Sequence, residues 1–127
     1  MYIERSIDTL LLEWKNSRSL KPLLLRGARQ VGKSWAVEHL GESFDYFIEV
    51  NFEKRPDMKD VFEKVHDVHE LANSLGILYN KPVEPGKTLI FLDEIQDSLP
   101  AIKSLWSFKE DFPGLHVVAA GSLLEFA

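Results

Sequence analysis

The amino-acid sequence predicts an α/β fold in which helices cover both faces of a doubly wound parallel sheet, giving three layers. Three observations support this prediction. Short apolar runs alternate with longer amphipathic stretches along the chain, as strands and helices do in such folds. Residues 88–94 form an apolar run that ends in two carboxylates, which is typical of a parallel strand buried on both faces. A glycine-containing turn connects the run at residues 23–25 directly to a helical stretch.

The first part of the chain predicts a helix, a strand and a second helix. Residues 2–16 should form an amphipathic helix that packs on the core or on a partner, because apolar side chains recur there at helical spacing. These apolar positions are Ile3, Ile7, Leu10, Leu11 and Trp14. Residues 23–25 predict the first strand, and residues 33–40 predict the next helix, with Gly41 as its C-terminal cap.

The middle of the chain predicts a strand and a broken helical region. Residues 46–53 alternate between an apolar set and a mostly polar set, which favours a strand with one solvated side or at a sheet edge. Residues 57–75 read as helical, with a break near His66 and Asp67. Two prolines and a glycine predict a loop over residues 80–87.

The last part predicts one helix between two strands. The strand at residues 88–94 precedes a helix over residues 98–109, with Ser98 as its N-cap and Pro100 in its first turn. The apolar positions of this helix are Leu99, Ile102, Leu105 and Trp106. Residues 115–120 predict the final strand, so the expected order is helix, strand, helix, strand, helices, strand, helix, strand.

The composition is that of one soluble domain, and we expect a single domain over residues 1–127. The chain has 127 residues, of which 45% are hydrophobic, and it has no stretch of about twenty apolar residues that could span a membrane. The N-terminal segment carries charges instead of the apolar core of a signal peptide, so we expect a cytoplasmic protein. The lack of cysteine excludes disulfides, thiolate catalysis and cysteine-ligated zinc.

The charge is unevenly distributed along the chain. The formal net charge is −5, yet the first 35 residues contain seven Lys and Arg against three Asp and Glu. The basic end suits an anionic ligand. The remaining residues contain eight basic side chains against seventeen acidic ones, which argues against direct nucleic-acid binding by this segment.

The most specific motif is the loop at residues 27–34, whose letters GARQVGKS fit the pattern G-x-x-x-x-G-K-S directly after a strand. Gly27 and Gly32 allow the backbone conformations and the close approach that a triphosphate requires. Lys33 supplies a positive charge for the β- and γ-phosphates in binding and catalysis, and the Ser34 hydroxyl can ligate Mg²⁺. The predicted nucleotide-binding residues are Gly27, Ala28, Arg29, Gln30, Val31, Gly32, Lys33, Ser34 and Trp35.

Two carboxylates at the end of the buried strand predict the second half of the site. Asp93 is the expected partner of the Mg²⁺ that Ser34 holds. Glu94 beside it can orient and polarise the water that attacks the γ-phosphate, which hydrolysis requires beyond binding. The alternative for Glu94 is that it caps the following helix, since helix starts favour acidic residues.

Four strings carry a family resemblance, at residues 25–34, 51–53, 91–96 and 120–124. Together they resemble the bacterial and archaeal AAA-type ATPases that carry a C-terminal domain of unknown function. The resemblance covers nearly the whole chain and implies a P-loop NTPase fold of the RecA or AAA kind, with strand order 1-4-3-2. Threonine is commoner than serine at position 34, but either hydroxyl can ligate Mg²⁺.

The resemblance also implies ligands, partners and an activity. ATP and Mg²⁺ are the expected ligands, and ATP hydrolysis is expected to drive a conformational or assembly change. In such ATPases a polar residue placed like Ser122 contacts the γ-phosphate or the attacking water, although serine after glycine is also ordinary in turns. A fifth core strand, a trans-acting arginine and the C-terminal domain would follow Ala127. We therefore expect an unprotected first strand, self-association or a C-terminal partner domain, and slow turnover by the isolated chain.

Other function classes share parts of this pattern. A GTPase would carry Asn-Lys-x-Asp, and the nearest string, residues 80–83, lacks the aspartate. A small-molecule kinase shares the phosphate loop but usually lacks the adjacent acidic pair. Residues 93–96 are similar to one helicase motif, Asp-Glu-x-Gln, but a helicase needs a second motor domain, which this sequence lacks. A nucleotide-gated binding module without appreciable turnover is a further alternative.

Several other residues have two interpretations. His66 and His69 could hold a metal with neighbouring glutamates, but a solvated helix face is the favoured interpretation. Arg29 and Gln30 could reach phosphates or a partner's nucleotide, or remain in solvent. Packing is favoured over adenine stacking for the three tryptophans, Trp14, Trp35 and Trp106.

Overall fold

The secondary structure follows the predicted order of elements. The computed structural model describes residues 2–27 and 31–122, with side chains for residues 7–26 and 33–121. Along the chain the elements are α1 (Tyr2–Lys15), β1 (Leu23–Gly27), α2 (Val31–Gly41), β2 (Tyr46–Asn51), α3 (Met58–Lys64), α4 (Val68–Tyr79), β3 (Thr88–Asp93), the 3₁₀ helix η1 (Ile95–Asp97), α5 (Leu99–Asp111) and β4 (His116–Ser122).

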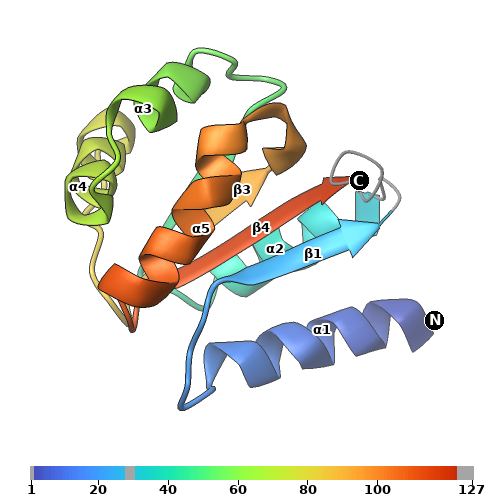
Figure 1. Ribbon diagram of the computed structural model, residues 1–127. Helices are drawn as coiled ribbons and strands as arrows, with labels where there is room; N and C mark the ends of the chain where they lie inside the picture. Colours follow the sequence, from blue (N-terminus) through green and yellow to red (C-terminus); the bar gives the residue numbers. More distant parts are fainter. Residues whose placement is uncertain (1, 28–30, 123–127) are drawn as a thin grey trace.

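The four strands form one parallel sheet in the order β1-β4-β3-β2, which confirms the predicted order (Figure 1). β4 is inserted between β1 and β3, so the strand before the phosphate loop and the acidic strand are not neighbours. β2 lies at one end of the sheet, as its alternating sequence predicted. β1 ends the sheet on the other side, and among the described strands it pairs with β4 alone. Its expected tendency to self-associate stays a prediction.

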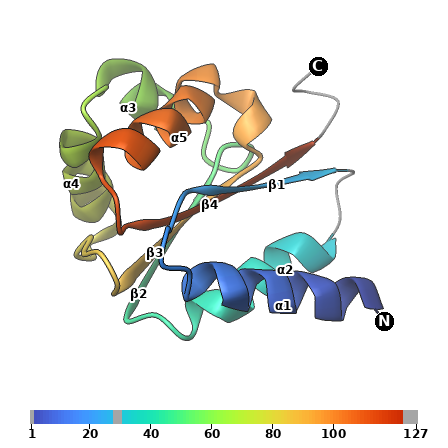
Figure 2. The same ribbon diagram turned by 60° about the horizontal axis from the view of Figure 1, so that its bottom comes forward.

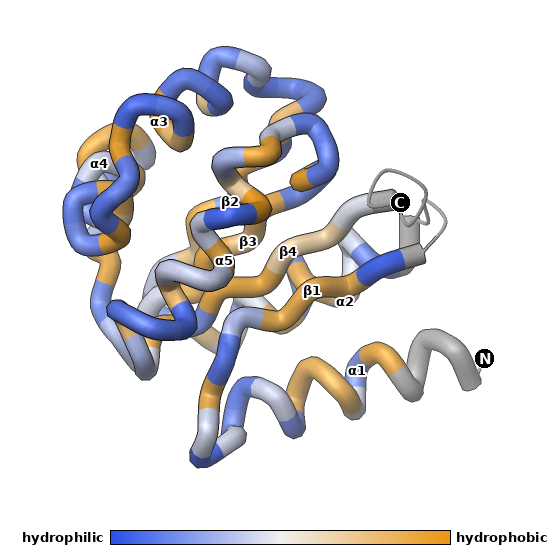
Figure 3. Tube along the Cα trace, in the orientation of Figure 1, coloured by the Kyte–Doolittle hydropathy of each residue, from blue (hydrophilic) through white to orange (hydrophobic). Residues whose placement is uncertain are grey.

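Helices cover both faces of the sheet and form the expected three layers. α1 and α2 lie side by side on one face, and α3, α4 and α5 lie on the other (Figure 2). β3 is buried along its whole length, because helices cover it on both sides and strands flank it. The two central strands, β3 and β4, are accordingly mainly hydrophobic along their length (Figure 3).

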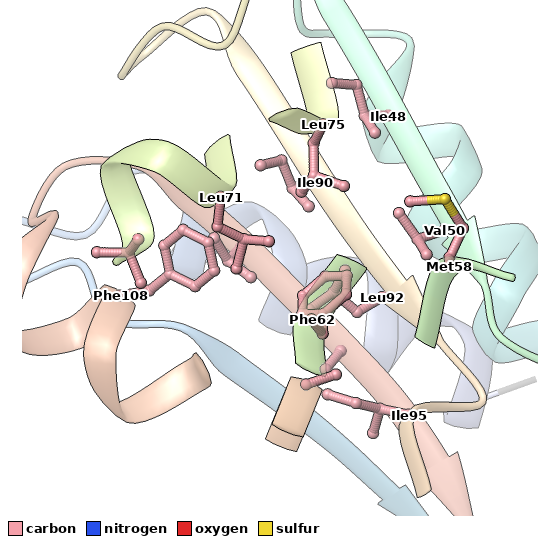
Figure 4. Close-up of a cluster of buried hydrophobic side chains, with 14 of the residues drawn as sticks. Ile48, Val50, Met58, Phe62, Leu71, Leu75, Ile90, Leu92, Ile95 and Phe108 are labelled. Atoms are coloured by element: carbon pink, nitrogen blue, oxygen red, sulfur yellow. The ribbon is translucent and has the colours of Figure 1, made fainter. Parts of the chain in front are cut away.

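Two apolar clusters hold the layers together. The larger one lies between the sheet and the helices α3, α4 and α5, where Phe62, Leu71 and Phe108 meet Ile90 and other strand residues (Figure 4). The smaller one joins the opposite face of the sheet to α1 and α2. Burial of apolar surface contributes roughly 25 cal/mol per Å² to folding, so these clusters anchor each helix to the sheet.

α1 is attached to the sheet through the middle and end of its apolar face. Leu11 and Trp14 are buried, and the Trp14 Nε1–H donates a hydrogen bond of 2.6 Å to the Lys21 carbonyl. Nε2 of the buried His116 on β4 lies 2.8 Å from the Lys15 carbonyl at the end of the helix. Leu10 is exposed and does not join the smaller apolar cluster, so the domain itself does not bury it. Its packing on a partner stays a prediction.

Gly41 does not cap α2 in the way the sequence suggested. It is the last residue of the helix, and it is not among the described glycines with positive φ, which are Gly86 and Gly114. A Cβ at position 41 would lie 2.7 Å from Cδ1 of Phe47 on β2. Gly41 is therefore explained by the close packing of an aromatic ring against the helix end.

The predicted break in the helical region is confirmed. α3 ends at Lys64, and Asp67 caps α4 by accepting hydrogen bonds from the backbone N–H groups of His69 and Glu70. α4 continues to Tyr79, four residues beyond the predicted end. It stops there because Asn80 adopts the left-handed conformation that often ends helices.

α5 begins as predicted, and the predicted apolar face is confirmed in part. Ser98 caps it, since its hydroxyl accepts a hydrogen bond from the Ala101 N–H at 3.2 Å. Ala101, Ser104 and Phe108 are buried, whereas Leu99 and Trp106 are exposed. Ile102 and Leu105 are partly buried and pack against the larger apolar cluster, so two of the four predicted apolar positions do face the core.

No helix in the described ranges is long and apolar enough to cross a membrane.

Candidate functional site

The carboxyl ends of the four strands meet at one edge of the sheet, and the predicted site residues gather there (Figure 1). Gly27 at the end of β1 is in register with Ser122 of β4. Asn51 at the end of β2 is in register with Asp93 of β3. α2 starts at Val31, soon after β1 ends. This is the edge at which parallel α/β sheets bind their ligands.

The glycine-rich loop is described in part. Ala28, Arg29 and Gln30 lie outside the described residues, so their predicted contacts are untested. Val31 and Gly32 belong to the first turn of α2, which starts two residues earlier than the sequence suggested. Strand, loop and helix thus follow one another as the motif requires.

Lys33 is the first residue of the loop motif whose side chain is described. Its Nζ donates a hydrogen bond of 2.8 Å to the Arg26 carbonyl near the end of β1. The bond holds the ammonium group across the loop, close to the strand. An anionic phosphate oxygen is a stronger acceptor for an ammonium group than a neutral carbonyl is, so a bound phosphate can replace this partner.

Ser34 and Asp93 meet at the centre of the site. The Ser34 hydroxyl donates a hydrogen bond of 3.1 Å to Oδ2 of Asp93, although the two residues lie 59 positions apart. Asp93 is buried, and this burial raises the pKa of its carboxyl above the ordinary value. Hydrogen bonds from the Glu94 N–H and the Ser34 hydroxyl oppose that rise, because they favour the charged carboxylate.

Glu94 has a left-handed backbone conformation, which is uncommon for residues other than glycine. Its φ is 54° and its ψ is 45°, in the left-handed region, which costs a non-glycine residue about 1 to 2 kcal/mol. Its N–H donates a hydrogen bond of 2.9 Å to Oδ1 of Asp93. Its side chain makes no capping hydrogen bond to the following 3₁₀ helix η1, so the capping alternative is not supported.

Gln96 contacts the Glu94 carboxylate from the helix that follows. Its Nε2 donates a hydrogen bond of 2.8 Å to Oε1 of Glu94. Sequence reasoning noticed Gln96 only as part of a string and gave it no role. The signal was available, because an amide two residues after a carboxylate can reach back to it once the chain turns sharply.

Asn51 is a second residue to which sequence reasoning gave no role. From the end of β2, its Nδ2 lies 3.4 Å from Oδ2 of Asp93, while its Oδ1 accepts hydrogen bonds from the N–H groups of Glu53 and Lys54, each 3.0 Å long. Asn51 therefore links the turn after β2 to the central carboxylate. Its place at the end of a strand beside the acidic strand was the signal that could have identified it.

A pair of carboxyl groups lies beside the site, on the face that α2 covers. Glu49 of β2 is half-buried and shares a hydrogen bond with Glu38 of α2. Burial, followed by the bond and the charge of Glu38 and the charge of Asp93, raises the pKa of Glu49 to about 7. The positive charge of Lys54 lowers the pKa of Glu49, against these larger effects. The sequence pattern did not indicate this pair.

The remaining predictions concern Ser122 and the three tryptophans. Ser122 lies at the tip of β4 opposite Gly27, as expected, but its side chain is outside the described set. Trp35 is 58% exposed and Trp106 is 67% exposed, so packing is the wrong explanation for both. Neither can be buried, because each lies on the outer side of its helix. Trp14 does pack in the core.

The two histidines with neighbouring glutamates do not share a helix face. His66 lies in the break between α3 and α4, where its Nε2 is 2.7 Å from the Glu63 carbonyl. His69 is on α4, with Nε2 2.9 Å from the Asp111 carbonyl and its ring stacked on Phe112. Within residues 7–26 and 33–121, no three histidine or acidic side chains form a group that could hold a metal ion.

The fold and this edge of the sheet together define the class of the protein. A four-stranded parallel sheet in the order 1-4-3-2, with a G-x-x-x-x-G-K-S turn after β1 and an aspartate ending β3, is the architecture of a P-loop nucleotide-binding domain. A family model described as an AAA domain matches residues 19–127. The chain therefore belongs to this AAA domain family, whose members are nucleotide-binding domains of the ATPase type.

No curated protein and no solved structure matches the chain. The bacterial or archaeal origin and the C-terminal domain that the resemblance implied are thus expectations without further support.

Proposed function

We propose that this domain binds Mg·ATP at the carboxyl edge of its sheet and hydrolyses it. The observation that carries the proposal is the hydrogen bond between Ser34 and Asp93, which joins the phosphate-loop helix to the acidic strand. Membership of the AAA domain family supports the same class of activity.

The donor groups at the centre of the site fit Mg²⁺. This ion prefers oxygen ligands and is usually bound through one or two protein groups together with substrate phosphates. The Ser34 hydroxyl and the Asp93 carboxylate are such oxygen donors and lie 3.1 Å apart. They would hold the ion, directly or through water. When bound, Mg²⁺ neutralises charge on the phosphate oxygens.

Lys33 and the start of α2 provide the remaining positive potential. The Lys33 ammonium is already held at the loop by the Arg26 carbonyl, so little ordering is needed when a phosphate arrives. Backbone N–H groups in the first turn of a helix have no partner within the helix and favour an anion. α2 begins at Val31, so its first turn belongs to the loop motif.

Glu94 is the residue we assign to activation of water. Its backbone strain and the hydrogen bond from Gln96 hold its carboxylate beside Asp93 without making it a metal partner. A carboxylate in that position can accept a proton from water as the oxygen attacks the γ-phosphate. A bond forms between the water oxygen and the γ-phosphorus, the proton moves to Glu94, and the bond from the γ-phosphorus to the bridging oxygen of the ADP leaving group breaks.

The experiment separates binding from turnover with two variants. Lys33→Ala should abolish Mg·ATP binding measured by calorimetry. Glu94→Gln should bind Mg·ATP like the wild type but release phosphate at least 100-fold more slowly, because general-base catalysis contributes roughly 10²- to 10⁴-fold. Equal loss of binding in both variants would contradict these separate roles. Normal turnover by Glu94→Gln would remove Glu94 from the mechanism.

The second part of the proposal concerns the assembly. Charge stabilisation by an arginine from a neighbouring subunit is worth about 10³- to 10⁵-fold in related nucleotide hydrolases where it is measured. We infer that self-association or an additional domain completes this site, so the isolated chain hydrolyses ATP slowly. Turnover near 1 s⁻¹ by a monomer would contradict this part without affecting the binding site.

A further inference from the structure

Trp35 has no structural explanation in the packing of the domain. It directly follows Ser34, yet 58% of its surface is exposed. A tryptophan that packs in this protein looks different, since Trp14 is 9% exposed and its indole N–H is bonded to a backbone carbonyl. Among the residues with described side chains, the indole N–H of Trp35 has no acceptor. A large aromatic group is thus left in solvent beside the phosphate loop.

The ring of Trp35 is nevertheless held in place. It stacks on the imidazole of His39, one turn further along α2, with ring centroids 5.2 Å apart and the planes only 3° from parallel. His39 in turn lies 3.7 Å from Glu42 at the end of the helix. The stack leaves the ring ordered but mostly uncovered, which suits an aromatic ligand because little freedom is lost when the ligand binds.

A groove continues from this stacked pair between α1 and α2. Its volume is about 280 Å³, and the side chains that line it are mainly apolar. The lining residues are Asp8, Leu11, Leu12, Ala36, His39, Leu40 and Ser43. His39 therefore belongs both to the stack and to the groove wall. The two helices lie side by side along this line in Figure 2.

The phosphate loop limits where the rest of a nucleotide can lie. In the proposed site, Lys33 and Ser34 hold the phosphates at the start of α2, so the ribose and base would extend from there. Trp35 is the next residue of the chain and carries the first aromatic ring after the loop. Its exposed ring is therefore the first aromatic surface that follows the residues assigned to the phosphates.

We propose that Trp35, held by His39, stacks on the nucleobase of a nucleoside triphosphate bound at the phosphate loop, beside the groove between α1 and α2. This inference rests on the proposed nucleotide site and adds the residue that holds the base. Stacking does not read hydrogen-bonding edges, and every base has a π-face. Trp35 therefore contributes to the binding of ATP and GTP alike.

The test compares a ligand that has a base with one that lacks it. The full chain is titrated with Mg·ATP, Mg·GTP and Mg·tripolyphosphate by calorimetry, as wild type, Trp35→Ala and Trp35→Phe. Trp35→Ala should weaken ATP and GTP binding by about 5-fold or more, the smallest effect expected for loss of one base–aromatic stack. Tripolyphosphate binding should change less than 2-fold, and Trp35→Phe should recover most of the affinity for ATP.

A matched control uses the other exposed tryptophan. Trp106 lies on α5, in the layer on the opposite face of the sheet, with Lys109 Nζ 5.6 Å from its ring centroid. Trp106→Ala should leave the binding of all three ligands unchanged. In the Trp106→Phe background, which retains Trp14 and Trp35, Mg·ATP should change the fluorescence and tripolyphosphate should not, and the change should be absent when Trp35→Phe is added.

The outcomes distinguish this inference from the proposed function. If the wild type binds ATP and tripolyphosphate but Trp35→Ala binds both normally, the stacking role is wrong and the phosphate site stands. Equal weakening of ATP and tripolyphosphate by Trp35→Ala would also overturn it, because a loop distortion would explain the result. Failure of the wild type to bind either ligand would overturn the nucleotide site itself, and the stacking role with it.

Discussion

At the scale of single residues, the contact between Gln96 and Glu94 has the clearest consequence for activity. The Gln96 amide donates to Oε1 of Glu94, and the left-handed backbone of Glu94 depends on its surroundings to be maintained. A carboxylate that must accept a proton from water needs a fixed orientation, because small displacements reduce rates strongly. Gln96 is therefore a positioning residue in this account.

We predict that Gln96→Ala lowers kcat for ATP hydrolysis about 10-fold and leaves the KM for ATP within 2-fold. Loss of one hydrogen bond to a charged group costs about 1.5 to 3 kcal/mol, and a cost of that size in the transition state lowers kcat by about 10-fold or more. Gln96→Glu should be slower still, because it places a second negative charge beside Glu94. Asn73→Ala, which removes an exposed amide on α4, is the matched control. A rise in KM with normal kcat would show instead that Gln96 supports binding.

The Glu49 carboxyl makes stability depend on pH in a direction opposite to most acidic groups. Its pKa of about 7 in the folded protein exceeds its ordinary value of 4.5, first because of burial and then because of Glu38. The folded state therefore binds more protons than the unfolded state between these values. Its contribution to stability is complete below pH 4.5 and is lost as the pH rises through 7.

We predict that Glu49→Gln removes this part of the pH dependence. Urea unfolding at pH 5 and pH 8 should show that the wild type loses stability between these values relative to the variant, by about 1 kcal/mol. This figure is reduced from the full linkage value because Glu49 is only half-buried and solvent screens it. Glu110→Gln on α5 serves as the exposed control. An identical pH dependence in wild type and Glu49→Gln would contradict the raised pKa.

At the scale of elements, the junction between α2 and β2 depends on the absence of a side chain. A methyl group at position 41 would meet the Phe47 ring at 2.7 Å, closer than real Cβ contacts allow. Alanine is better than glycine inside a helix by up to about 1 kcal/mol. Overpacking costs about 1 to 3 kcal/mol, so the steric effect should be the larger of the two.

We predict that Gly41→Ala lowers the free energy of unfolding by about 1 kcal/mol in urea denaturation. The same substitution in a Phe47→Ala background should be neutral or stabilising, since the ring that it meets is then absent. The difference between the two backgrounds measures the contact directly. A stabilising effect of Gly41→Ala in the wild-type protein would show that the ring moves aside at little cost.

The sequence predicted the elements better than it predicted the faces of the helices. The order and type of the elements are confirmed, because apolar runs and turn residues act locally. The strand order that the family resemblance implied is confirmed as well. On α5 the predicted Ile102 and Leu105 do pack against the core, but Leu99 and Trp106 are exposed. The buried Ala101 and Ser104 were missed, because they are less apolar and close helix packing selects small side chains. Hydropathy alone does not carry that information.

The sequence likewise predicted some residues of the candidate site and missed others. Lys33, Ser34, Asp93 and Glu94 were predicted from the motifs, since the chemistry of phosphate binding restricts residue type and spacing. The contributions of Asn51 and Gln96 depend on contacts across strands and a sharp turn, which a linear pattern does not show. The Glu38–Glu49 pair was missed for the same reason, because a strand and a helix bring it together.

At the scale of the whole molecule, the sheet brings distant parts of the chain to one edge. β1 and α2 flank the phosphate loop, β3 supplies Asp93, the turn between β3 and η1 supplies Glu94, and β2 supplies Asn51. α1 packs beside α2 and connects back to β4 through the Lys15 carbonyl and His116. The layers therefore support the site from both faces of the sheet.

Calorimetric titration of ATP into the full chain, with and without Mg²⁺, tests this account most directly. We predict that the wild type binds one ATP per chain in the presence of Mg²⁺. Asp93→Asn should lose the dependence on Mg²⁺, while Lys33→Ala should show no measurable binding with or without the ion, because it loses the positive charge and the charge-assisted hydrogen bond to the phosphates. Equal ATP binding by the wild type and Lys33→Ala, or no binding by the wild type at millimolar ATP, would contradict the claim that this edge of the sheet is a nucleotide site.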